Sequence, residues 1–392
     1  MNLNIFQKMG CVECKYCKQE EDNNQFEYPN NIKKENKNNN SIKNSNKGIN
    51  NSINSNNSNQ FLQEFNEKIN FIGTPVTEEE FLIMLPDQVN TIIQNEPLQH
   101  SKDIKSHNIK PIEFSNGNIY HGQWNTNFEM DGYGKYYLKD ERILAEGIWD
   151  KGELKHARIF YPNGDIYEGE MLDSFYNGKG KLILQNKDTY IGQFEKGEKN
   201  GEGKMIFNDG TEYNGNFTNN NFNGYGNMKW QNGIEYKGNF SENFLEGEGV
   251  LINNNNGEKY EGYFNKNLFH GKGKYTYSNG DEYDGDFEYG IRKGKGTYKK
   301  KDGFLYEGFW DNNIPNGFGK ITYNDNVLKC NFHNGNLIYN SFSKSDGLID
   351  NIDYNFFNQP MNLSTLKFSH LESNEVSSSQ YKPDTKLSFL ED

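Results

Sequence analysis

One motif recurs at an almost constant spacing through the second half of this chain. It reads Tyr-x-Gly-x-Z, where Z is Met, Phe or Trp, and a Gly-x-Gly pair follows each tyrosine after about eleven residues. The tyrosines are 23 residues apart, with one step of 24: Tyr167, Tyr190, Tyr213, Tyr236, Tyr260, Tyr283 and Tyr306. A unit this short cannot bury a core alone, so a fixed period predicts a stack of identical units in which each packs on its neighbours.

Each unit predicts two short β-strands. In Tyr-x-Gly-x-Phe the tyrosine, glycine and phenylalanine alternate with polar residues and therefore share one strand face. Asn-Gly pairs predict tight hairpin turns. The strand glycines leave bare backbone, which we expect rings of the neighbouring unit to cover. The candidate packing and groove rings are Tyr167, Tyr190, Phe194, Tyr213, Phe217, Tyr236, Phe240, Tyr260, Phe264, Tyr283, Phe287, Tyr306 and Trp310.

Further copies flank the seven units. Tyr120 begins a good copy, and Leu144 begins a degraded one that is displaced by a residue and lacks the glycine pair. Leu328 begins a decayed fragment. We therefore expect about nine units within residues 113–340, folded as an all-β, elongated, single-layer antiparallel sheet of stacked hairpins.

These motifs resemble the MORN repeat (membrane occupation and recognition nexus). The resemblance implies a non-enzymatic array that holds other proteins or lies near membranes and cytoskeleton. In relatives that are enzymes, such as phosphatidylinositol phosphate kinases, catalysis resides in a separate domain. No kinase phosphate loop or catalytic loop is found in this sequence, and the Gly-x-Gly pairs lead into strands, not helices. We expect no enzymatic activity, no cofactor and no metal site.

The amino-acid composition and charge exclude further classes of function. The formal net charge of −13 argues against nucleic-acid binding, which needs a basic face. We find no apolar run of membrane-spanning length and no secretory signal, and the cysteine usage favours a reducing, cytoplasmic location. Residues 30–59 contain 14 Asn, so residues 1–60 are predicted to be a disordered tether. Residues 341–392 are likewise expected to be a mostly disordered tail.

A cysteine cluster lies near the amino terminus. A start at Met9 would expose Gly10 for myristoylation beside Cys11, and Cys11, Cys14 and Cys17 are candidates for palmitoylation. An inert cluster and metal binding through the Cys-x-x-Cys-x-x-Cys spacing remain open alternatives. Two acyl groups would anchor the protein stably to a membrane, whereas one would not.

Residues 61–112 are expected to form a short helical cap. Thr77 and Glu80 make a capping box before Phe81, and Pro86 then interrupts the helix. The helical segment would cover the open edge of the first hairpin; a docking helix for a partner is the alternative.

The sequence favours a scaffold or tether that binds partner proteins along the repeats, with membrane, cortex or cilium association through an acylated terminus. Alternatives are a regulatory or targeting subunit of a separate enzyme, such as a phosphatidylinositol phosphate kinase, and a direct phospholipid-binding module. The array's charge opposes lipid binding, except at one candidate basic patch: Arg292, Lys293, Lys295, Lys299, Lys300 and Lys301. Partner identity and a homodimer are left open.

Overall fold

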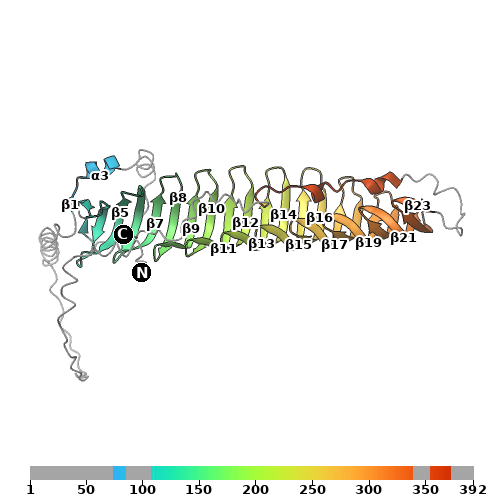
Figure 1. The fold of residues 1–392 in the computed structure, drawn as a ribbon, viewed down its shortest axis with the longest axis horizontal. Coiled ribbons are helices and arrows are strands. Elements are labelled where there is room, and N and C mark those ends of the chain that lie inside the picture. The colour runs from blue at the N-terminus through green and yellow to red at the C-terminus, as the bar shows by residue number, and fades with distance from the viewer. Residues whose placement is uncertain (1–73, 85–106, 109, 339–353, 372–392) are drawn as a thin grey trace, which may run out of the picture. The chain divides into compact units, whose positions relative to one another are not determined.

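The computed structural model describes residues 74–84, 107–108, 110–338 and 354–371. These residues belong to two compact units, which we call unit 1, ending at Asn177, and unit 2, beginning at Gly178. The predicted all-β fold is confirmed in both, because successive strands pair antiparallel in chain order (Figure 1).

Unit 1 begins with short elements and continues as paired hairpin strands. Its strand β4 pairs with β3, which pairs with β1, and β2 pairs with the other end of β4. Its elements are β1 (Thr74–Pro75), α3 (Glu78–Met84), β2 (His107–Asn108), β3 (Ile112–Glu113), β4 (Ile119–Trp124), β5 (Met130–Leu138), β6 (Ile143–Asp150), β7 (Glu153–Phe160) and β8 (Ile166–Leu172).

Helix α3 begins at the predicted capping box. The Thr77 backbone N–H donates to the Glu80 carboxylate over 2.7 Å, and the Glu80 N–H donates to the Thr77 hydroxyl over 3.1 Å. Phe81 is completely buried and packs with Ile119 and other apolar residues of the sheet. The expected position of this helix over the open edge of the first hairpin is therefore wrong. It covers a sheet face, and the edge of the first hairpin is closed by β1, β2 and β3 instead. The expected second helical turn after Pro86 lies outside the described residues.

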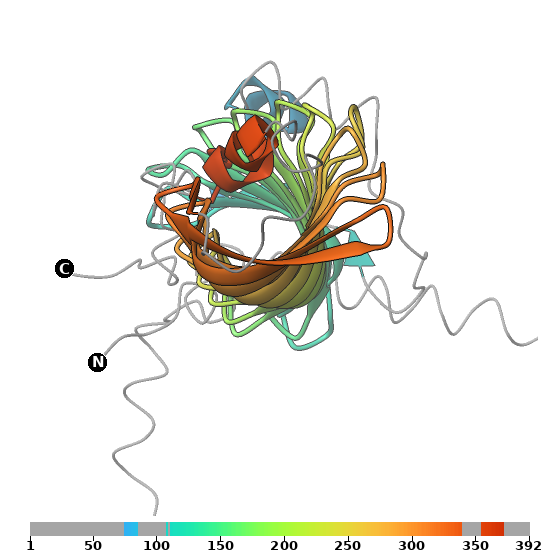
Figure 2. The same ribbon diagram turned by 90° about the vertical axis from the view of Figure 1, so that its right-hand side faces the viewer.

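Unit 2 is a longer series of the same hairpins, and β9 (Phe175–Ile183) contains the boundary. Its strands bend, and the C-terminal segment lies on the inner side of the bend (Figure 2). Its remaining strands are β10 (Thr189–Glu195), β11 (Glu198–Ile206), β12 (Glu212–Thr218), β13 (Asn221–Lys229), β14 (Ile234–Ser241), β15 (Phe244–Asn253), β16 (Lys259–Asn265), β17 (Leu268–Thr276), β18 (Glu282–Glu288), β19 (Ile291–Lys299), β20 (Leu305–Asp311), β21 (Ile314–Tyr323), β22 (Asn326–His333) and β23 (Asn336–Ile338).

The tight turns lie elsewhere than the sequence predicted. Strand pair β12–β13 is joined by the two residues Asn219 and Asn220, both with positive φ (47° and 69°), as a type I′ turn requires. The Asn232-Gly233 pair instead belongs to a four-residue loop between β13 and β14. The side chains of Asn220 and its counterparts also accept hydrogen bonds from backbone N–H groups of the preceding hairpin. These bonds link adjacent hairpins within unit 2.

The weak copies keep the register of the strong ones. Gly132 pairs with Trp149 and Tyr136 with Ala145, so Ala145 holds the tyrosine position. The predicted displacement of this unit is therefore wrong. In the terminal fragment, Leu328 holds the tyrosine position and Cys330 the glycine position, since they pair with Ile321 and Gly319.

Residues 354–371, here called the docked segment, also differ from expectation. This part of the tail was predicted to be unstructured, but it contains the 3-10 helices η1 (Tyr354–Asn358) and η2 (Asn362–Thr365). It becomes ordered because Phe357, Met361, Leu363, Phe368 and Leu371 are buried. Their spacing is irregular, so no periodic pattern announces the segment in the sequence.

Candidate functional site

In the hairpins of unit 2, one tyrosine ring lies over two paired glycines. Gly215 of β12 is opposite Gly226 of β13, and a methyl group on Gly226 would lie 2.6 Å from the Tyr213 ring. The Tyr213 hydroxyl donates over 2.8 Å to the carbonyl of Asn216, where the pairing shifts register. Each ring therefore covers glycines of its own repeat, and the prediction that rings of the neighbouring repeat cover them is wrong.

The neighbouring unit contributes a different ring. The Tyr213 ring contacts Phe217 of its own repeat and Phe240 of the next repeat, both edge to face. Their ring centroids lie 5.2 and 5.1 Å from that of Tyr213. The same arrangement recurs at Tyr190, Tyr236, Tyr260 and Tyr283. All thirteen rings singled out in the sequence are less than 5% exposed, so they build the core.

The docked segment lies along the inner face of unit 2, which we call the groove. Its phenylalanine Phe357 is 2% exposed and contacts Tyr306, Trp310 and Phe332 at centroid distances between 5.4 and 5.9 Å. The ring of Phe356 stacks on Tyr298. Aromatic side chains of three strands, β19, β20 and β22, thus hold the start of this segment.

Arg292 fixes the backbone of the docked segment. Its guanidinium donates to the Phe357 carbonyl over 2.7 Å, to the Asn313 carbonyl over 2.6 Å and to the Tyr277 hydroxyl over 2.8 Å. Its charged carbon also lies 4.6 Å from the Trp310 ring centroid, a cation–π geometry. Arg292 is 1% exposed, so the proposed basic patch loses this member.

The middle of the segment is held by polar groups of the inter-unit loops. Asn362 donates from its amide to Glu258 over 2.9 Å, and Leu363 is buried against the groove. Glu258 is itself 1% exposed, and its carboxylate also accepts from the Asn256 amide over 3.2 Å. Such matched polar contacts give the groove sequence preference.

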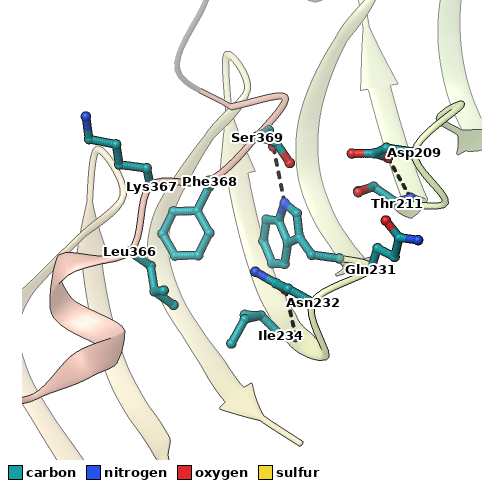
Figure 3. Close-up of a pocket in the computed structure, with 10 residues that line it drawn as sticks. Asp209, Thr211, Gln231, Asn232, Ile234, Leu366, Lys367, Phe368 and Ser369 are labelled. Carbon is teal, nitrogen blue, oxygen red and sulfur yellow. Dashed lines mark hydrogen bonds between the residues drawn. The ribbon is translucent and has the colours of Figure 1, made fainter. Parts of the chain in front are cut away.

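The last residues of the segment reach the first hairpins of unit 2. Phe368 packs on Trp230 at 4.9 Å, and the indole N–H donates to the Ser369 carbonyl over 3.2 Å (Figure 3). His370 stacks on Phe207 at 3.8 Å and meets the Asp209 carboxylate at 3.0 Å. A pocket of about 300 Å³ lies here, lined by residues of both the loops and the segment, among them Thr211, Gln231 and Lys367.

Burial changes the pKa values of two side chains, Tyr277 and Cys330. Burial raises the pKa of the Tyr277 hydroxyl to about 12, although the adjacent Arg292 charge opposes this shift. Burial likewise raises the pKa of the Cys330 thiol to about 12. These hydroxyl and thiol groups therefore stay neutral near pH 7 and serve as packing and hydrogen-bonding groups.

The remaining basic residues are placed separately. Lys293 pairs with Glu288, Lys300 pairs with Asp302 at 2.9 Å and lies over the Phe356 ring, and Lys295 lies over the Phe309 ring. Lys299 and Lys301 are exposed. The cluster is therefore divided between the groove and the outer surface, and three of its lysines are engaged with acids or rings.

The other candidate sites stay predictions. Gly10, Cys11, Cys14 and Cys17 lie outside the described residues. Within the residues that the structure describes, no cluster of ligands suited to a metal ion occurs. The helices among those same residues are all too short or too polar to cross a bilayer.

Seven consecutive units of this chain match a known family model. The MORN repeat model matches residues 167–189, 190–212, 213–235, 236–258, 260–282, 283–304 and 306–327. The units at Tyr120 and Leu144 lie outside these matches. No curated protein matches the sequence.

Some solved structures show a distant likeness. One is the TCP domain of Drosophila melanogaster SAS-4 in complex with a proline-rich motif of Ana2, at 12% identity, covering 61% of this chain and 99% of that one. Another is the TCP10 domain of Danio rerio CPAP, at 13% identity, covering 53% and 86%. Both have a TM-score of 0.22, so neither supports a further conclusion.

Proposed function

Starting from the seven consecutive MORN repeats of residues 167–327, we propose that this chain is a non-enzymatic scaffold that binds a partner protein in the groove of unit 2. MORN repeats imply a repeat scaffold with a protein- or membrane-binding role. The observation that supports the finer proposal is the docked segment, a peptide already held lengthwise by side chains of successive units. A partner that offers aromatic side chains and free backbone carbonyls would use the same contacts.

The contacts define what such a partner presents. A phenylalanine fits the ring cluster around Trp310, and the carbonyl beside it accepts from Arg292. A second aromatic residue eleven positions later fits against Trp230, since Phe357 and Phe368 have that spacing. The partner is therefore an extended peptide segment with two aromatic anchors.

Binding in trans tests this proposal. In a chain lacking residues 354–371, a fluorescent peptide of that sequence should bind saturably, whereas the intact chain should bind it weakly because its groove is filled. A peptide with Phe357→Ala and Phe368→Ala is the matched control. If the shortened chain, shown by circular dichroism to keep its strands, fails to bind the peptide, the groove is not a peptide site.

Tethering through an acylated amino terminus is a separate part of the proposal, and it would place the scaffold at a membrane, the cell cortex or a cilium. It is supported by the Gly10-Cys11 sequence and the nearby Cys14 and Cys17. Intact mass measurement of natively expressed chain should show added acyl mass that Gly10→Ala, Cys11→Ser, Cys14→Ser and Cys17→Ser together abolish. Flotation with anionic liposomes in the absence of acyl mass would favour direct lipid binding instead.

A further inference from the structure

The outer face of unit 2, which lies away from the docked segment, has two exposed rings on neighbouring strands (Figure 2). Phe309 of β20 is 42% exposed and Phe318 of β21 is 67% exposed. Both point outward, because side chains alternate along a strand and the adjacent Trp310 is buried on the inner side. Gly308 pairs with Gly319, so the two phenylalanines lie side by side. We call them the outer pair.

The same two positions serve a different purpose in other repeats. The Gln193 side chain accepts from the Glu202 backbone N–H over 3.4 Å, and the Asp286 carboxylate accepts from the Lys295 N–H over 3.0 Å. A phenylalanine has no atom that could accept such a bond. No other repeat of unit 2 has aromatic residues at both positions. Phe309 thus gives up a backbone contact and places apolar surface in water, which a binding surface explains and the fold does not.

Exposed lysines flank the outer pair. The Lys295 ammonium lies 5.6 Å from the Phe309 ring centroid, and Lys329 of β22 is directly opposite Lys320 of β21. Glu307 forms an ion pair with Lys320. The ion pairs among the described residues include neither Lys295 nor Lys329. Two uncompensated cations therefore border the exposed rings, in a chain with a net charge of −13.

We propose that the outer pair and these two lysines bind an acidic segment of a partner protein. An apolar side chain of the segment covers Phe318, and carboxylates on either side of it pair with Lys295 and Lys329. These lysines lie three strands apart, about 14 Å, which is the length of about four extended residues. The segment therefore has an apolar residue between two acids about four positions apart.

Charge complementarity selects this occupant. Acidic segments are repelled by most of this acidic chain, so the local basic border also determines where on the array such a partner binds. An anionic lipid surface fits less well, because the carboxylates of Glu307 and Asp286 lie among the lysines and would face the lipid head groups. This surface is separate from the groove and adds a second protein-binding site to the scaffold.

Selection of a random peptide library on the full-length chain tests the proposal. Peptides that bind the unaltered chain but not Phe318→Ser should contain an apolar residue between two acids. In fluorescence anisotropy, Phe318→Ser and Lys329→Glu should each weaken binding of such a peptide by about tenfold or more. Tyr225→Ser, which changes a 63% exposed ring at the equivalent position of β13, is the matched control and should leave the Kd unchanged.

The outcomes separate this surface from the groove. Circular dichroism should show that the variants keep their strands, since all the altered side chains are exposed. If no selected peptide depends on Phe318, or if the dependent peptides lack acids, the outer surface is not an acidic-peptide site. Flotation with phosphatidylserine vesicles that requires Phe318, without peptide binding, would assign the surface to lipid and overturn the proposal. Peptides that depend on Arg292 and not on Phe318 report on the groove alone.

Discussion

The ring of Tyr213 leaves no room for a side chain at Gly226. We therefore expect substitutions at these two positions to have strongly coupled effects on the free energy of unfolding. A methyl group at Gly226 would approach three atoms of Tyr213 within 2.6 to 2.8 Å, well inside contact distance. The ring cannot move aside, because Phe217 and Phe240 flank it and its hydroxyl is bonded to the Asn216 carbonyl. Gly226→Ala should therefore destabilise the hairpin by about 3 kcal/mol, the upper range for overpacking.

Removing the ring should abolish this penalty. Tyr213→Ala alone should destabilise by about 3–5 kcal/mol, as loss of a buried aromatic does. Adding Gly226→Ala to it should then cost nothing further, because the new methyl group enters vacated space. The expected coupling free energy is about 3 kcal/mol. Unit 1 already contains such a combination: Ala145 holds the tyrosine position and Ala157 is opposite Gly147.

Native-state hydrogen exchange of β12 and β13, with urea titration of the whole chain, measures the four variants. Local exchange is needed because repeat arrays do not always unfold in one step. Gly224→Ala is the control: Gly224 has φ +76°, so an added side chain is strained there with or without the ring, and its cost should be equal in both backgrounds. If Gly226→Ala costs the same with and without Tyr213, the ring does not exclude the side chain.

Three further predictions concern the groove and its buried groups. Arg292→Met should release the docked segment and raise the exchange rate of η1 at least tenfold, whereas Lys293→Met, an exposed neighbour, should leave that rate unchanged. Cys330 should resist iodoacetamide at pH 8 in the folded chain and react after unfolding, as peptide mass mapping would show, because burial raises its thiol pKa to about 12; rapid labelling of the native chain would contradict its burial. The free energy of unfolding of the unaltered chain relative to that of Lys199→Met should rise as pH increases from about 8 toward the unfolded lysine pKa of about 10.4, because the folded pKa of Lys199 is lower than the unfolded one. Lys199→Met is the reference in these urea titrations because the raised pKa of the buried Cys330 thiol acts in the opposite direction over this range, and a difference between the two chains that does not change with pH would contradict the assignment to Lys199.

The period and the alternation were sufficient to predict the hairpins and the buried face. They could not predict which unit's ring covers a glycine, because that depends on the register shift that turns the Asn216 carbonyl toward Tyr213. The displaced register assigned to Leu144 arose from aligning one apolar residue with a tyrosine. The combined change to Ala145 and Ala157 is the signal that identifies the true alignment.

The groove occupant was missed for a different reason. Phe356 and Phe357 stand out as an aromatic pair in a polar tail, but their partners are far away in the sequence and no short-range pattern links them. Arg292 was assigned to a surface patch because neighbouring lysines surround it in the sequence. Its strand position, opposite Phe287, places it inward, as alternation along β19 requires.

The docked segment changes how the order of synthesis relates to the order of assembly. Hairpins of unit 2 pair with neighbours about 23 residues away, so each can form soon after it emerges. The contacts of the segment join residues as far apart as His370 and Asp209, 161 positions in sequence. During translation the first hairpins of unit 2 are therefore made well before the end of the segment that covers them.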